Sequence, residues 1–109
     1  MPTLEASGTQ TATISTEHTL ATITTNKTLT LIVDTAAMAA DDVLELRVKT
    51  KVLSGGTTRV VQKATYQHAQ PADDLIKMSL PVQSDQEYVA TLKQTAGTGR
   101  AFPWKVLSP

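Results

Sequence analysis

The chain has 109 residues, a common size for one domain and too few for two separate cores. Ten basic and ten acidic side chains cancel to a formal net charge of +0, so the basic excess typical of nucleic-acid-binding proteins is missing. The chain contains no cysteine, which excludes disulfides, thiolate metal sites and cysteine nucleophiles. Hydrophobic residues at 40% and charged residues at 18% are typical of a folded globular domain.

The N-terminal segment has no recognisable pattern. Residues 1–12 are predicted to form a flexible arm, and residues 13–109 the folded domain. Met1 to Gly8 have neither a basic start nor an apolar core, so they do not resemble a signal peptide, and synthesis in a cytoplasm is expected. No apolar run approaches the roughly 20 residues that cross a bilayer, so no membrane partner is expected.

The first third of the chain is rich in threonine, a β-branched residue that favours strands. Strands are predicted over residues 11–14 and 18–24. A tight hairpin turn at 26–27 is expected to lead into a strand over residues 28–33, with its leucines and Val33 on one face. The alanine-rich residues 35–40 are predicted to form a short helical connection.

The clearest strand pattern covers residues 43–53. One face carries the apolar residues Leu44, Leu46, Val48 and Val52. The other face carries the charged residues Glu45, Arg47, Lys49 and Lys51. The glycines in residues 54–57 favour a turn, after which residues 59–68 are expected to return as the hairpin partner.

Three more strands are predicted toward the C-terminus. Residues 76–82 form a short strand that Pro81 confines to an edge or an end. Residues 87–94 place Tyr88, Ala90 and Leu92 on one face, and after a turn at 96–99 a final strand alternates Phe102, Trp104 and Val106. The sum is an all-β fold: a single jelly-roll-like β-sandwich of seven or eight short antiparallel strands.

Few residues favour catalysis or metal binding. His18 and His68 could join aspartates in a metal site, but no ligand spacing supports one. The pairs Asp41-Asp42 and Asp73-Asp74 resemble the two carboxyl groups of a glycosidase, but turn formation explains both. We therefore expect no enzyme activity, no cofactor and no small-molecule substrate.

Residues 97–100 resemble an anion-binding nest, in which glycines expose backbone amides and Arg100 adds a positive charge. No helix follows, so a hairpin turn is the better interpretation. The charged face of residues 43–53 leaves two interpretations open, a solvated surface or a surface that docks on a protein partner. The candidate docking residues are Glu45, Arg47, Lys49, Lys51 and Arg100.

Three segments together resemble small proteins encoded among the structural genes of tailed bacteriophages: Ser15 to Leu20, Leu44 to Lys51, and Ala90 to Trp104. The resemblance covers roughly residues 14 to 107 and transfers no active-site residues. It implies a non-enzymatic virion component that contacts the major capsid protein and copies of itself. A capsid decoration or cement protein is the first hypothesis. A tail, connector or host-adsorption part with a carbohydrate-binding module is the alternative.

Overall fold

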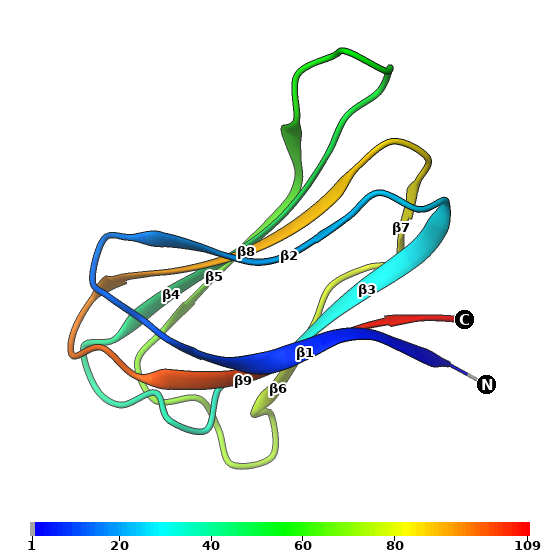
Figure 1. Ribbon diagram of the computed structural model, residues 1–109. Helices are drawn as coiled ribbons and strands as arrows, with labels where there is room; N and C mark the ends of the chain where they lie inside the picture. Colours follow the sequence, from blue (N-terminus) through cyan, green and yellow to red (C-terminus); the bar gives the residue numbers. More distant parts are fainter. Residues whose placement is uncertain (1) are drawn as a thin grey trace.

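The computed structural model describes residues 2–109, which form nine β-strands and no helix (Figure 1). The all-β prediction is therefore confirmed. The strands are β1 (Thr3–Thr11), β2 (Glu17–Ile23), β3 (Lys27–Asp34), β4 (Val43–Thr50), β5 (Arg59–Gln67), β6 (Ile76–Met78), β7 (Val82–Ser84), β8 (Tyr88–Ala96) and β9 (Ala101–Ser108).

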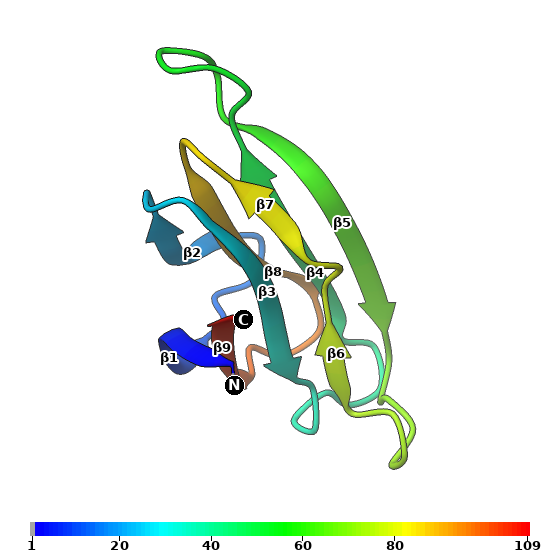
Figure 2. The same cartoon turned by 90° about the vertical axis from the view of Figure 1, so that its right-hand side faces the viewer.

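The strands form two antiparallel sheets that lie face to face (Figures 1 and 2). The first sheet has the order β1-β9-β3-β6, with β7 also paired to β3, and the second has the order β2-β8-β4-β5. The single strand predicted over residues 76–82 is present as two pieces, β6 and β7, on the same side of β3. This β-sandwich-like arrangement gives each sheet one inner and one outer face.

Only one connection in the described chain, between β4 and β5, is a hairpin of neighbouring strands within one sheet, and this one was predicted. The hairpin turn predicted at residues 26–27 is wrong, because β2 and β3 belong to different sheets. The turn at residues 96–99 also crosses, from β8 in the second sheet to β9 in the first. Short polar turns look alike in sequence whether they return to the same sheet or cross to the other.

Strand β1 lies where a patternless arm was expected. Thr3–Thr11 pair antiparallel with β9 along their whole length, with a bulge that leaves Glu5 unpaired in the ladder. All side chains of β1 are exposed or half-buried, and the strand lacks the apolar alternation that identifies a strand in sequence. Backbone pairing with β9 supplies its order instead.

The short helix predicted over residues 35–40 is absent, and this segment is a series of turns. Three contacts hold the turns in place. Asp34 Oδ1 accepts the Ala36 N–H at 2.9 Å, the Thr35 N–H donates to Leu75 O at 3.0 Å, and Met38 is buried in the core. These tertiary contacts outweigh the weak helix preference of six residues.

Side chains from both sheets share one core. The predicted inward faces of β3, β4 and β8 are confirmed, and Trp104 packs against the core while partly buried. Val52, predicted on the inward face, is 83% exposed because β4 ends two residues before it. The buried residues that the sequence indicated are Leu29, Leu31, Val33, Leu44, Leu46, Val48, Tyr88, Ala90, Leu92, Phe102 and Val106.

Candidate functional site

Three of the five predicted docking residues lie together on the outer face of the second sheet. Glu45, Arg47 and Lys49 alternate along β4 and point away from the core, as the pattern predicted. The adjacent strand β5 adds Lys63, and β2, which lies on the far side of β8, adds Glu17. We call these five residues the charged face.

The members of the charged face pair with one another. Arg47 contacts Glu45 at 2.7 Å and Glu17 at 3.9 Å, and Lys49 contacts Glu17 at 3.0 Å. Lys63 lies 3.8 Å from Glu45. The five residues therefore form one ion-pair network that connects β2, β4 and β5.

Both carboxylates of the charged face are held in the ionised form. The hydrogen bonds from Arg47 lower the pKa of Glu45 in spite of partial burial. The Thr91 hydroxyl donates to Glu17 at 2.7 Å, and with Lys49 and Arg47 it lowers the pKa of Glu17. Docking a partner here would remove water from charges that already have partners, which costs free energy without forming new pairs.

The other two predicted docking residues lie elsewhere. Lys51 follows the end of β4, at the start of the loop to β5. Arg100 lies at the opposite end of that strand, where its Nε donates to Asp42 Oδ2 at 2.8 Å. The structure thus separates the predicted docking set into three places.

The nest-like turn at residues 97–100 already holds an anion, the carboxylate of Asp42. Asp42 Oδ1 accepts the Thr98 N–H at 3.1 Å, and Oδ2 accepts the Ala39 N–H at 2.9 Å as well as Arg100 Nε. Gly97 has φ +90°, and a Cβ there would lie 2.0 Å from Asp42 Oδ1. The turn is therefore shaped to close on this side chain.

Asp42 is fully buried, and burial acts to raise its pKa, but the bonds from Ala39, Arg100 and Thr98 outweigh this and lower the pKa. Buried Gln94 extends the same set of contacts, donating to Thr98 O at 2.7 Å and accepting the Arg100 N–H at 3.1 Å. We call Asp42, Gln94 and Arg100 the Asp42 network. It ties the β3–β4 loop to the turn between β8 and β9.

The two histidines accept hydrogen bonds from backbone N–H groups. His18 Nε2 accepts the Thr13 N–H at 3.0 Å, and His68 Nδ1 accepts the Asp41 N–H at 3.1 Å. Among residues 2–109, no three His, Asp or Glu side chains gather closely enough to hold a metal ion. In the same part of the chain, no helix is long and apolar enough to cross a membrane.

The outer face of the first sheet carries exposed apolar side chains that were not predicted from the sequence. Cross-strand partners share a face, and here Ile32 is paired with Met78 and Asp34 with Ile76. Ile76 and Met78 are 54% and 63% exposed. We call this surface the apolar face; its members are Leu4, Ile32, Ile76, Met78, Pro103 and Leu107, with the charged residues Asp34 and Lys105.

Sequence reasoning missed this face because the alternation in β6 is inverted. Lys77, between two apolar residues, would ordinarily point outward, but it is 7% exposed and turned inward. Its ammonium lies 4.9 Å from the centre of the Tyr66 ring and 3.0 Å from Asp74 Oδ2. Partners for the charge allow the aliphatic stem to be buried, and Ile76 and Met78 are left outside.

The β4–β5 hairpin ends in a second exposed apolar feature, residues 51–58, which we call the hairpin tip. Val52 and Leu53 are 83% and 71% exposed. Both views show the tip projecting beyond the rest of the two sheets (Figures 1 and 2). Large apolar side chains at a projecting loop are suited to insertion into a partner.

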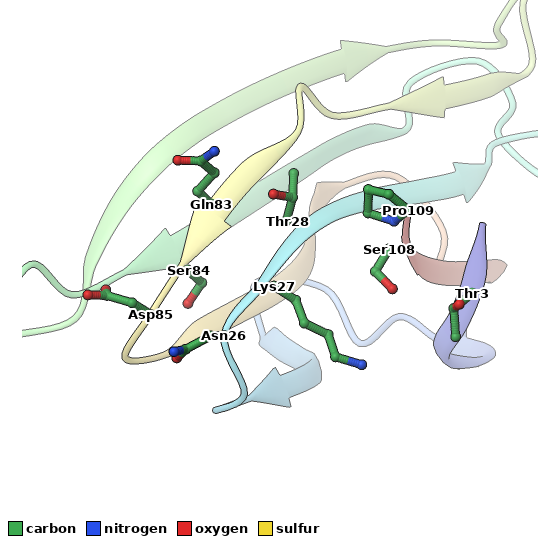
Figure 3. A pocket seen from close by; sticks show the side chains of 9 residues that line it. All are labelled: Thr3, Asn26, Lys27, Thr28, Gln83, Ser84, Asp85, Ser108 and Pro109. Atoms are coloured by element: carbon green, nitrogen blue, oxygen red, sulfur yellow. The ribbon is translucent and has the colours of Figure 1, made fainter. Parts of the chain in front are cut away.

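A polar cavity of about 740 Å³ opens beside the ends of β3 and β7. Lys27, Ser108 and Thr3 lie along one side and Asp85 at the other end (Figure 3). Lys27 is paired with Glu5 at 2.6 Å, and hydrogen bonds from Lys27 and Ser108 lower the pKa of Glu5. The lining offers hydrogen-bonding groups but no aromatic ring.

Comparisons of the chain with protein-family models, with curated proteins and with solved structures found no match. The assignment of function therefore depends on the surfaces described above.

Proposed function

We propose that the chain is a non-enzymatic bacteriophage virion protein, a capsid decoration or cement protein that stabilises the head by docking on the major capsid protein. The observation that carries this proposal is the hairpin tip. Val52 and Leu53 are held in water at the end of a projecting hairpin. Exposing two adjacent large apolar side chains is unfavourable in an isolated chain and is relieved when a partner covers them.

The base of the hairpin tip is anchored, so its apolar end is presented in a defined direction. Thr50 Oγ1 donates to Glu87 O at 2.8 Å, and Thr58 Oγ1 donates to a carboxylate oxygen of Glu87. The Gly56 N–H closes the turn by donating to Leu53 O at 2.9 Å. A tip that is already held in one conformation loses less conformational entropy on docking than a free loop would.

The strand order gives further support. If β6 and β7 are counted as one interrupted sixth strand, β8 becomes the seventh strand and β9 the eighth. The first sheet then has the order first-eighth-third-sixth, and the second sheet the order second-seventh-fourth-fifth. This is the strand order of a jelly roll, an architecture used by viral capsid and lectin domains. Architecture alone does not assign a function, so this support is by analogy.

The first test is mass spectrometry of purified virions of the phage that encodes the chain. The proposal expects the chain among the virion proteins, in a copy number that follows the symmetry of the shell. Its absence from intact virions would overturn the proposal.

A variant pair tests the hairpin tip itself. Val52→Asp with Leu53→Asp is expected to lower incorporation into virions by about tenfold or more, because each buried apolar side chain contributes about 1.5–3 kcal/mol. The matched control, Ser54→Asp with Thr57→Asp, adds the same charge to the same exposed tip without removing an apolar contact. Equal incorporation of the two variants would contradict docking through Val52 and Leu53.

The alternative is a tail, connector or host-adsorption component that binds carbohydrate. The polar cavity favours it, because Asn26, Asp85 and neighbouring hydroxyls could hydrogen-bond a sugar. The missing aromatic ring weakens it, because rings commonly provide the apolar contact in such sites. A glycan array separates the two proposals: binding that Asp85→Ala abolishes supports the alternative, and silence across host polysaccharides removes it.

A further inference from the structure

We infer that the apolar face is a self-pairing surface, on which two copies of this chain meet through their first sheets about a two-fold axis. The inference goes beyond the proposed function, which names a capsid contact at the hairpin tip, by adding a contact between copies. It concerns the outer face of the first sheet, on the opposite layer from the hairpin that carries the proposed capsid contact.

The apolar content of this face requires a cover. Ile76 and Met78 of β6 are more than half exposed, and half-buried Ile32 and Leu107 continue the surface across β3 and β9. A hollow of about 160 Å³ on the same face is lined by Ile32, Ile76 and Pro103. A contiguous apolar surface of this kind marks an interaction site.

The two charged residues of this face identify the occupant. Lys105 is paired with Ile32 across the ladder, and Asp34 lies two residues further along the same face of β3. Within residues 2–109 neither takes part in an ion pair. One positive and one negative group on neighbouring strands, both without an opposite charge, give the face a self-complementary charge pattern.

A two-fold axis in the plane of contact, passing midway between Lys105 and Asp34, places each of them beside the other residue of the second copy. In such an isologous contact, residue i meets j and j meets i, so two ion pairs form at once. The same operation lays β6 of one copy against the apolar face of the other. A strongly acidic or strongly basic partner finds no matching excess here, and zero net charge removes long-range repulsion between copies.

The experiment measures molar mass by light scattering of the full chain over a concentration series. The unaltered chain is expected to reach a discrete dimer mass. Ile76→Lys is expected to stay monomeric, because it places a charge in the middle of the apolar contact. The matched control is Val60→Lys, a similarly exposed position on β5 of the second sheet, which is expected to dimerise like the unaltered chain.

A charge swap tests the two-fold pairing directly. Lys105→Asp and Asp34→Lys should each weaken the homodimer, about tenfold or more in dissociation constant, because each sets like charges against each other. An equimolar mixture of the two variants should restore a dimer that contains one copy of each. Asp34→Asn, which keeps an oxygen acceptor for the Ala36 N–H, controls for loss of that turn contact.

A monomeric mass for the unaltered chain at every concentration would overturn the inference, and so would a dimer that Ile76→Lys leaves intact. Mixed variants that fail to form the heterodimer would overturn the two-fold pairing of Lys105 with Asp34. A chain that forms this dimer but is absent from virions would reject the proposed function alone. A chain that is present in virions but monomeric in solution would reject this inference alone.

Discussion

The two outer faces of the molecule have the same strand geometry and opposite chemistry. On the second sheet, Glu45, Arg47 and Lys49 join Glu17 and Lys63 in a network of ion pairs. On the first sheet, the outward positions carry apolar residues such as Ile76 and Met78 beside several threonines, and the charges of Asp34 and Lys105 have no ion-pair partner in the described chain. The charged face pairs five of its charged residues with one another, whereas the apolar face leaves both Asp34 and Lys105 without an opposite charge among the residues that the structure describes.

The outward direction of a charged side chain and its pairing are separate properties, and alternation in the sequence predicts only the first. The alternating charges of residues 45–51 are the candidate partner contacts, and in the structure Glu45 binds Arg47 while Lys49 binds Glu17. Covering such a network with a partner costs desolvation and returns little. Covering exposed isoleucine and methionine side chains stabilises a complex by roughly 25 cal/mol for each Å² of apolar surface removed from water.

The largest expected effect is a difference in the free energy of unfolding between a variant in the core and a variant on the apolar face. Leu92 is fully buried between the sheets, so Leu92→Ala should lower the free energy of unfolding by about 2–5 kcal/mol. Met78→Ala on the apolar face should change it by no more than about 0.5 kcal/mol when measured on the monomer. Chemical denaturation at low protein concentration measures both. Similar losses in the two variants would show that the apolar face belongs to the core.

The next largest effect concerns the Asp42 network, which we expect to stabilise the contact between the β3–β4 loop and the β8–β9 turn. Asp42→Ala leaves the part-buried N–H groups of Ala39 and Thr98 without their acceptor. Arg100 is partly exposed and can turn to water, so we expect a loss of about 2–4 kcal/mol in unfolding free energy. The control is Asp73→Ala, an exposed aspartate, expected to be neutral. Equal stability of the two variants would contradict a structural role for Asp42.

A smaller effect is expected on the charged face. Arg47→Ala removes the central cation of the network, and partly exposed ion pairs contribute about 1 kcal/mol or less. The loss should shrink as salt is raised, because salt screens these pairs. Lys105→Ala, measured on the monomer, should have no such salt-dependent loss. A salt-independent loss for Arg47→Ala would show that its contribution is packing rather than charge.

The smallest effect is a change in pH dependence. The folded state lowers the pKa of Glu45 below its ordinary value of 4.5. The unfolded state therefore takes up the proton first, and the stability that Glu45 contributes is present above pH 4.5 and lost as pH falls through the folded pKa. Stability of the unaltered chain should fall on acidification below about pH 5. Glu45→Gln should reduce the steepness of that fall, and an unchanged slope would contradict the pairing with Arg47.

Much of the fold could be predicted from local pattern. Strict alternation identified β4 and β8, and the glycine-rich turn after β4 identified the one hairpin. Strand β1 could not be predicted, because it lacks apolar alternation and pairs with β9, a strand far away in the sequence. The sheet to which each strand belongs was also beyond reach, because crossing turns and hairpin turns use the same residues.

The sites divide in the same way. The outward direction of Glu45, Arg47 and Lys49 followed from alternation, whereas their pairing with Glu17 depended on strand order. The anchoring of Arg100 could not be predicted, because its partner Asp42 is 58 residues away in the chain. The apolar face was hidden by the inward turn of Lys77, which only Tyr66 and Asp74 explain.

The most direct test of the contrast between the two faces is lysine acetylation followed by mass spectrometry over a protein concentration series. Lys105 reports on the apolar face, and Lys63, whose side chain is 52% exposed, reports on the charged face. We predict that acetylation of Lys105 slows as concentration rises while that of Lys63 stays constant. Protection of Lys63 in place of Lys105, or protection of neither, would contradict the assignment of the apolar face as the surface on which copies meet.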